Sequence, residues 1–257
     1  MRRIGDKILK GYSLLLYVFL YAPILIMVVF SFNDSRLLAI WRGFSLKWYD
    51  TLLADPTVWR AFYNSIWVAA LTTVISMVLG TMVAFAMIRY NFRGKSILDS
   101  AIYFPVVIPE ITEALSLLLF YVFTGIPLGA ATVAIGHIAF SISYATIVIR
   151  ARLVGFDRSV EEAAKSLGAN ELRTFFHVTL PLILPGVIAG GLLAFTVSYD
   201  DFVKTAFTTG PGFQTLPLRI YAMASRGGVS PLLNALATIT LAVSLCLAVV
   251  RLRLSKT

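Results

Sequence analysis

Charged residues and cysteine are scarce in this chain of 257 residues. Asp, Glu, Lys and Arg make up 14% of it, against about 25% in ordinary soluble domains. The one cysteine, Cys246, lies in an apolar run, which excludes an intrachain disulfide and predicts a small buried hydrophobe. With two histidines and no HExxH pattern, no metal site and no catalytic residues are predicted, and the lack of a P-loop sequence excludes ATP binding of that kind. His137, inside an apolar stretch, is expected to hydrogen-bond to a neighbouring helix.

Long apolar segments make up most of the chain. Hydrophobic residues account for 58%, and six segments approach or exceed the roughly 20 residues that a membrane-spanning helix needs. Such runs are helices, because barrel strands alternate over about ten residues. The sequence therefore predicts one all-α integral membrane domain over residues 1–257. Its six predicted spans are 12–32, 61–88, 99–123, 126–149, 183–207 and 230–250.

The basic residues predict the orientation of these spans. The formal net charge of +9 would suggest nucleic acid in a soluble domain, but no basic face with interleaved aromatics is present, and no nucleic-acid partner is expected. Fifteen Lys and Arg residues fall on one side of the six spans and seven on the other, counting Lys204 among the seven. The positive-inside rule then makes both termini and the loop over 151–182 cytoplasmic. Trp41, Trp48 and Trp59 fall on the outer side, as an interfacial belt or as a contact with an external partner.

The segment EEAAKSLGANELRTFFHVTLPLILPG, from Glu161 to Gly186, is the most polar part of the chain. Ser159 and Glu162 have the spacing of a capping box, which predicts a short helix from Ser159. Gly168 suits the left-handed position after that helix, and Asn170 can cap a second short helix that runs through Thr179. The expected product is a helix-turn-helix at the cytoplasmic surface. It is either a docking surface with small residues or an interfacial amphipathic pair without a partner.

The pattern Glu162-Ala163-Ala164-x-x-x-Gly168, followed by Leu180-Pro181, resembles the EAA motif of permeases of type I ABC importers, the binding-protein-dependent class. In that family this loop is a coupling helix that docks into a groove of a cytoplasmic ATPase. The resemblance therefore implies the type I ABC importer permease fold. It assigns the ATPase contact to Glu161, Glu162, Ala163, Ala164 and Gly168.

Further segments narrow the resemblance to the spermidine/putrescine (PotC-like) permeases: FNDSR at 32–36, KWYDTLL at 47–53, YNFRGK at 90–95, LAFTVSYDD at 193–201 and NALATI at 234–239. The family implies a bacterial inner-membrane protein that works with a homologous second permease, two ATPase subunits and an external substrate-binding protein. In that arrangement this chain binds no cofactor and is not an enzyme, since ATP and Mg²⁺ bind to the ATPase. Close relatives also move other small solutes, including aminophosphonates.

Glu110 and Glu113 are the first candidates for a substrate path. They lie on one face of the third predicted span, because three residues separate them, and Glu110 falls near mid-bilayer. Ionisable groups inside a span are functional-site hypotheses by default. Pro105 and Pro109 predict a kinked helix that lines a cavity. The alternative is a structural kink whose carboxylates pair with Arg or with the backbone.

Asp200 and Asp201 come late in the fifth predicted span. Adjacent positions point about 100° apart on a helix, so one of the two is expected to face the pore, unless both form a cap near the outer surface. Tyr144 and Tyr199 are expected to offer aromatic faces to an ammonium group. Polyamine permeases similarly carry an acid at the position of Glu110 and a Ser-x-Asp-Asp pattern like that at 198–201.

The predicted function is therefore that of a permease subunit in an ATP-driven importer, for polyamines or another small solute such as an aminophosphonate. A secondary carrier that uses the same acids for proton coupling is the rival, although no internal repeat of the kind many carriers contain is visible. A membrane scaffold without transport activity is the third possibility.

Overall fold

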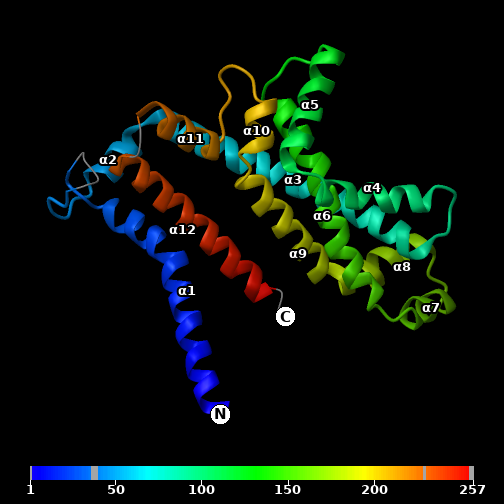
Figure 1. Cartoon of the computed structure of the whole chain (residues 1–257). Coiled ribbons are helices and arrows are strands. Elements are labelled where there is room, and N and C mark those ends of the chain that lie inside the picture. The colour runs from blue at the N-terminus through cyan, green and yellow to red at the C-terminus, as the bar shows by residue number, and fades with distance from the viewer. Residues whose placement is uncertain (1, 36–39, 228–229, 255–257) are drawn as a thin grey trace. The chain divides into compact units, whose positions relative to one another are not determined.

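The computed structural model describes residues 2–35, 40–227 and 230–254, and within these ranges it is almost entirely helical (Figure 1). Arg36 and Lys256, which contribute to the charge asymmetry, lie outside the described residues. The helices are α1 Arg2–Phe30, α2 Lys47–Ala54, α3 Pro56–Arg89, α4 Lys95–Val107, α5 Glu110–Thr124, α6 Ala130–Val154, α7 Ser159–Ser166, α8 Glu171–Thr174, η1 Phe175–Thr179, α9 Leu180–Tyr199, α10 Val203–Thr208, α11 Leu216–Gly227 and α12 Pro231–Leu254.

Four helical segments of the described chain are long and apolar enough to cross a membrane: Leu9–Phe30, Pro56–Arg89, Ala130–Val154 and Glu171–Tyr199. A fifth crossing is possible if α4 and α5 together form one. The apolar part of α12, Pro231–Cys246, is shorter than these four segments. Cys246 is exposed, so its predicted burial is wrong.

The third predicted span, 99–123, is not one kinked helix. It is divided between α4 and α5, whose axes are bent by 112° at the break. Ile108 and Pro109 are extended there, with ψ angles of 140° and 131°. Pro109 has no N–H to donate to an α4 carbonyl, and it disfavours the α conformation of Ile108. Pro105, by contrast, stays inside α4. The break makes Glu110 the first residue of a new helix.

The fifth predicted span, 183–207, is also divided differently. The helix begins at Glu171, passes through the π-helical turn η1 and ends at Tyr199, while α10 is a separate short helix. In the π turn, the N–H of Leu180 donates to the carbonyl of Phe175, five residues back. The next residue is Pro181, which has no N–H and crowds the preceding turn, so the wider turn accommodates it without a break.

The chain divides into two compact units. Unit 1 comprises Met1–Trp59 and Arg219–Val243. Its first helix exposes a wide apolar surface, including Leu15 and Phe19, as a lipid-facing helix does. The turn after α1 is held by Asn33, whose side-chain amide donates to the carbonyl of Ile40 and whose backbone carbonyl accepts from the Trp48 indole. Trp48 therefore has a structural hydrogen bond in addition to its expected interfacial position.

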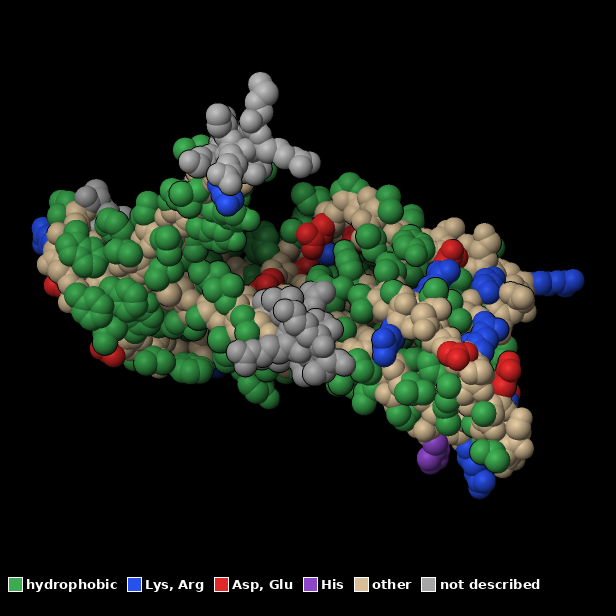
Figure 2. Space-filling view, turned by 90° about the horizontal axis from the view of Figure 1, so that it is seen from below, with side chains coloured by type: hydrophobic (Ala, Val, Ile, Leu, Met, Phe, Trp, Pro, Cys, Tyr) green, Lys and Arg blue, Asp and Glu red, His purple; other side chains and the backbone are tan. Residues whose placement is uncertain are grey.

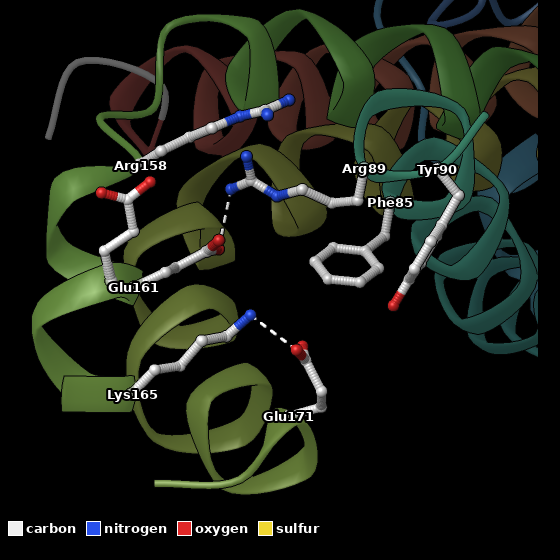
Figure 3. Close-up of a pocket in the computed structure, with 8 residues that line it drawn as sticks. Phe85, Arg89, Tyr90, Arg158, Glu161, Lys165 and Glu171 are labelled. Atoms are coloured by element: carbon white, nitrogen blue, oxygen red, sulfur yellow. Dashed lines mark hydrogen bonds and ion pairs between the residues drawn. The ribbon is translucent and has the colours of Figure 1, made fainter. Parts of the chain in front are cut away.

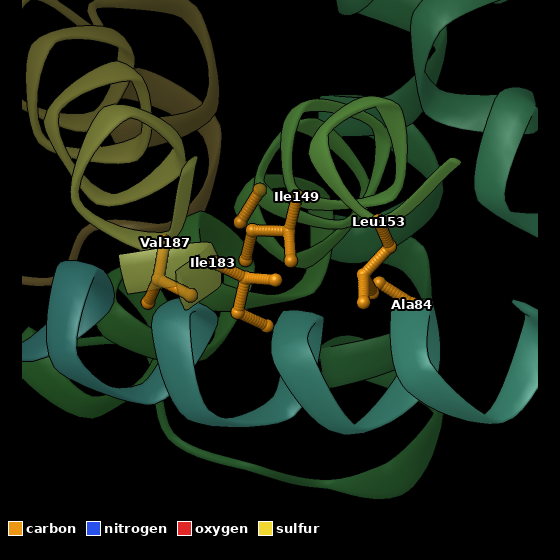
Figure 4. Close-up of a cluster of buried hydrophobic side chains, with 6 residues drawn as sticks. Ala84, Ile149, Leu153, Ile183 and Val187 are labelled. Carbon is orange, nitrogen blue, oxygen red and sulfur yellow. The ribbon is translucent and has the colours of Figure 1, made fainter. Parts of the chain in front are cut away.

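Unit 2 comprises Arg60–Leu218 and Ser244–Thr257 and contains the candidate sites. Helices α6 and α9 lie side by side at its centre (Figure 1). Gly190 permits this contact, since a Cβ there would lie 3.2 Å from the carbonyl oxygen of Ala145. A core cluster joins α3, α6 and α9 (Figure 4), formed by Ala84, Ala145, Ile149, Leu153, Ile183 and Val187. In Figure 2 most of the visible face is hydrophobic, and Lys and Arg side chains gather at the end of unit 2 that carries α7 and α8.

Candidate functional site: a carboxylate cluster and a polar loop

The break between α4 and α5 brings two acids to the same place in unit 2. Glu110 begins α5 and Glu113 lies one turn later, so both carboxylates reach the same cation, as their spacing predicts. That cation is the Lys204 ammonium, 2.8 Å from Oε1 of Glu110 and 3.5 Å from Oε2 of Glu113. The two carboxylates are therefore paired, as the structural alternative predicted, but with lysine rather than with arginine or the backbone.

Helix α10 supplies Lys204, and the short connection before it supplies a third carboxylate. Asp201 lies just before α10, and its Oδ1 accepts the backbone N–H of Thr205 at 2.9 Å. Its Oδ2 lies 3.6 Å from the Lys204 ammonium. The ammonium also lies 3.8 Å from the ring centroid of Phe140, within cation–π distance. Lys204 thus has three carboxylates and one aromatic face around it.

His137 anchors this cluster to the centre of the unit. Its Nδ1 lies 2.8 Å from the Ser198 hydroxyl on α9, and its Nε2 lies 3.0 Å from the Thr205 hydroxyl on α10. Nε2 is also 3.3 Å from Oδ1 of Asp201. The predicted hydrogen bonding of His137 to neighbouring helices is confirmed. The imidazole links α6, α9 and α10 and orients the carboxylate beside Lys204.

The other candidates of the predicted path lie elsewhere. Asp200 ends α9, is exposed, and accepts a hydrogen bond from the hydroxyl of Ser244, so the two adjacent aspartates do point in different directions. Tyr199 is buried and stacked on Phe195. Tyr144 contacts the ring of Phe140 edge-on. The aromatic face beside the ammonium is that of Phe140, not of either tyrosine.

Sequence reasoning missed Lys204 by counting it as an outer loop residue. Its side chain is 4% exposed and belongs to the cluster, so it does not belong in a count of loop charges. The signal was present in Asp201-x-x-Lys204, since residues three apart meet on a helix. What the cluster does chemically is hold a protonated primary amine: Glu110 accepts a hydrogen bond from it, the carboxylates of Glu113 and Asp201 lie within ion-pair distance, and the ring of Phe140 covers one side.

The second candidate site is the polar loop at the other end of α6. Helix α7 begins at Ser159 as predicted, but the capping box is wrong. The carboxylate of Asp157 instead accepts the backbone N–H of Ser159 at 3.0 Å and its hydroxyl at 2.8 Å. These two hydrogen bonds lower the pKa of Asp157 below its usual range. The Asp157 carboxylate, two residues before the first residue of α7, thus binds the serine hydroxyl that the capping box would have used.

The turn after α7 follows the prediction. Gly168 has φ +89°, the left-handed conformation that glycine adopts without strain. The side chain of Asn170 accepts the N–H of Arg173 and caps α8. This second helix does not end at Thr179, because α8, η1 and α9 are continuous from Glu171 to Tyr199.

The five residues assigned to the ATPase contact do not all face outward. Glu162, Ala163 and Gly168 are exposed, and Leu167 beside them is 90% exposed. Glu161 points inward (Figure 3): its Oε1 lies 2.7 Å from a guanidinium nitrogen of Arg89, at the end of α3, and also accepts the Thr179 hydroxyl at 2.6 Å. Glu161 therefore joins α7 to α3 and η1 rather than offering a docking surface.

This ion pair lines a polar pocket of about 210 Å³ (Figure 3). Lys165 and Glu171 form a second pair across it, at 2.6 Å. The nearby carboxylate raises the pKa of Lys165. The two pairs hold α7 against α3 and against the start of the long helix.

Four apolar helical segments of membrane-crossing length in the described residues define a polytopic membrane protein. The comparisons agree with this class. Residues 76–256 match the family described as binding-protein-dependent transport system inner membrane component, and the chain belongs to that family.

Two curated relatives match nearly the whole chain. The spermidine/putrescine transport system permease protein PotC of Escherichia coli (strain K12) is 39% identical over 246 residues, covering 96% of this chain and 93% of PotC. The putrescine transport system permease protein PotI of the same organism is 42% identical over 235 residues, covering 89% and 83%. The predicted likeness to polyamine permeases is confirmed.

The fold has close counterparts among solved structures. A chain of a bacterial ABC transporter involved in the import of the acidic polysaccharide alginate superposes with a TM-score of 0.77, covering 98% of this chain and 95% of the other. A chain of a bacterial alginate ABC transporter in complex with an alginate-pentasaccharide-bound periplasmic protein gives a TM-score of 0.76, covering 99% of this chain and 96% of the other. Sequence identities are 15% and 16%, so these likenesses concern the fold: it is that of an ABC importer permease.

Proposed function

We propose that this chain is the permease subunit of an ATP-driven importer of polyamines, and that it forms half of the translocation path. Six crossings, counting α4–α5 as one broken span and α12 as the last, would leave both termini in the cytoplasm. The distribution of Lys and Arg supports this orientation, and removing Lys204 from the outer count strengthens the asymmetry.

The observation that carries the substrate class is the environment of Lys204. A protonated primary amine already sits among Glu110, Glu113 and Asp201 and against Phe140. These contacts suit the ends of a polyamine, which are protonated primary amines on apolar chains. The names of PotC and PotI support the same class. Glu110, which is 48% exposed, is the carboxylate that an entering amine meets first.

The loop around α7 is the proposed contact with a separate ATPase, through Glu162, Ala163, Ala164 and Gly168. Its exposed small residues and Leu167 support a docking role, because small side chains let another backbone approach closely. Glu161 and Arg89 would pass movement of the ATPase to α3. The other proposed partners are a homologous permease and an external binding protein. ATP and Mg²⁺ would bind to the ATPase and not to this chain.

Uptake of labelled putrescine and spermidine by cells that express the complete transporter tests the substrate class. We expect import by the wild type and its loss in Glu110→Gln and Glu113→Gln at equal membrane levels. Asp50→Asn, which neutralises an exposed carboxylate of α2, is the matched control and should import normally. Asp201 is a poor test residue, since its carboxylate also caps α10.

If the wild type moves neither amine, the polyamine assignment is wrong, and aminophosphonates are the next substrates to test. Co-purification in mild detergent tests the driving force separately. An ATPase should be recovered with this chain, whereas a secondary carrier would transport without one.

A further inference from the structure

Lys204 is unusual because its ammonium fills the site that the acids would otherwise offer to substrate. It makes a 2.8 Å hydrogen bond to Glu110 and lies 3.5 and 3.6 Å from Glu113 and Asp201. Its Nζ lies 3.8 Å from the ring centroid of Phe140. Every group around it is one that would bind the protonated amine of a small solute.

The chemistry of the lysine side chain strengthens this equivalence. Four methylene groups end in a primary ammonium, which is also the structure of one end of putrescine and of the longer arm of spermidine. The substrate of the proposed function and Lys204 therefore present the same donor on the same kind of apolar stem. They are competitors for the same carboxylates.

Charge and exposure indicate where the exchange would occur. Three carboxylates surround one ammonium, so the cluster retains acceptor capacity beyond what Lys204 uses. Glu110 is half exposed, while the side chains of Asp201 and Lys204 are 1% and 4% exposed. Lys204 thus reaches Glu110 from the buried side. If it gave up Glu110, Lys204 would still have Asp201 and Phe140 as partners, so the lysine need not become unpaired.

We propose that Lys204 is a resident ammonium that occupies the amine site of the path when no substrate is present, and that an entering amine takes over Glu110 from it. This inference rests on the proposed function, because it assumes that amines pass the cluster. Competition by Lys204 weakens substrate binding, prevents the acids from trapping the amine, and makes Lys204 a residue that sets affinity.

Equilibrium binding of labelled putrescine tests the proposal on the complex purified from membranes, without external binding protein. Lys204→Met removes the ammonium and keeps an unbranched side chain. We expect it to bind putrescine about tenfold more tightly or better, since one charge-assisted hydrogen bond is no longer contested. Lys10→Met, at an exposed position of α1, is the matched control and should bind as the wild type does. Unchanged or weaker binding by Lys204→Met with a wild-type melting temperature overturns the proposal.

A second measurement covers the case in which the uncompensated acids destabilise that variant. In Lys204→Ala, putrescine should enter the vacated site and raise the melting temperature more than it does in the wild type or in Lys10→Ala. Equal shifts in all three proteins overturn the proposal. Failure of the proposed function looks different: the wild type then neither imports nor binds putrescine, and the resident-ammonium proposal falls with it.

Discussion

Replacing Glu161 by alanine is expected to destabilise the protein, whereas the same change at its neighbour Glu162 is not. The Glu161 carboxylate is held by Arg89 at 2.7 Å and by the Thr179 hydroxyl at 2.6 Å, while the Glu162 side chain is exposed. The two residues are adjacent and chemically identical. The comparison therefore isolates the effect of their position on α7.

The expected magnitude follows from burial of the pair. Removing one partner of a buried ion pair costs about 3–5 kcal/mol, because the other charge is left without compensation. Arg89 and Glu161 keep 9% and 11% of their side-chain exposure, so we expect the lower end, about 3 kcal/mol. For a chain of this size that corresponds to a fall in melting temperature of about 6–12 °C. Glu162→Ala should change it by less than about 2 °C.

Two assays separate an effect on stability from an effect on ATPase docking. Thermal melting of the purified protein measures stability, and recovery of the ATPase from mild detergent measures docking. Glu161→Ala should lower the melting temperature, and adding Arg89→Met should restore part of the loss, since the stranded guanidinium is removed. Glu162→Ala should keep the melting temperature and recover less ATPase. The reasoning is refuted if both glutamate variants melt alike, or if Glu161→Ala melts within 2 °C of the wild type.

Three further changes test other parts of the structure. Gly168→Trp should abolish uptake at normal membrane levels, whereas Gly168→Asn should keep the loop folded, because asparagine tolerates the left-handed φ of +89°; full uptake by the tryptophan variant would contradict the docking assignment. Gly210→Ala should destabilise the protein by about 2 kcal/mol or more, since the new Cβ would overlap the backbone carbonyl of Leu128, and wild-type melting would show that this loop contact is wrong. The capping hydrogen bonds to Asp157 should weaken as pH falls. Its pKa is lowered in the folded protein, so its stabilisation is complete above the pKa of the unfolded chain and is lost as pH drops through the folded value. Hydrogen exchange of α7 amides, corrected for intrinsic rates, should then rise at acidic pH in the wild type and stay flat in Asp157→Asn, whose amide caps without titrating.

Several features of the fold were predictable because they depend on composition or on a few consecutive residues. Apolar runs longer than the bilayer thickness must become helices, since a lipid-exposed backbone has to satisfy its own hydrogen bonds. The left-handed conformation of Gly168 and the cap by Asn170 were predictable too, because each depends only on the residues of its own turn. The resemblance to PotC-like permeases could likewise be recognised from short segments, and PotC is 39% identical to this chain.

Helix boundaries were less predictable. Pro109 indicated a disturbance but not a bend of 112°, because a proline can kink a helix or end it, depending on what packs against the freed carbonyls. Pro181 shows the opposite outcome, since the π turn carries the helix through it.

The sequence by itself determined that this is an all-helical membrane protein with a polar loop and a small set of acids within apolar segments. Only the tertiary structure decided what those acids contact. Lys204 is 94 residues from Glu110 along the chain, and Glu161 is 72 residues from Arg89. Periodicity shows which residues share a face of one helix, but not which helix faces another. An ion pair between distant segments exists only after packing brings them together, and that packing decides which of two adjacent acids, Glu161 or Glu162 and Asp201 or Asp200, becomes buried.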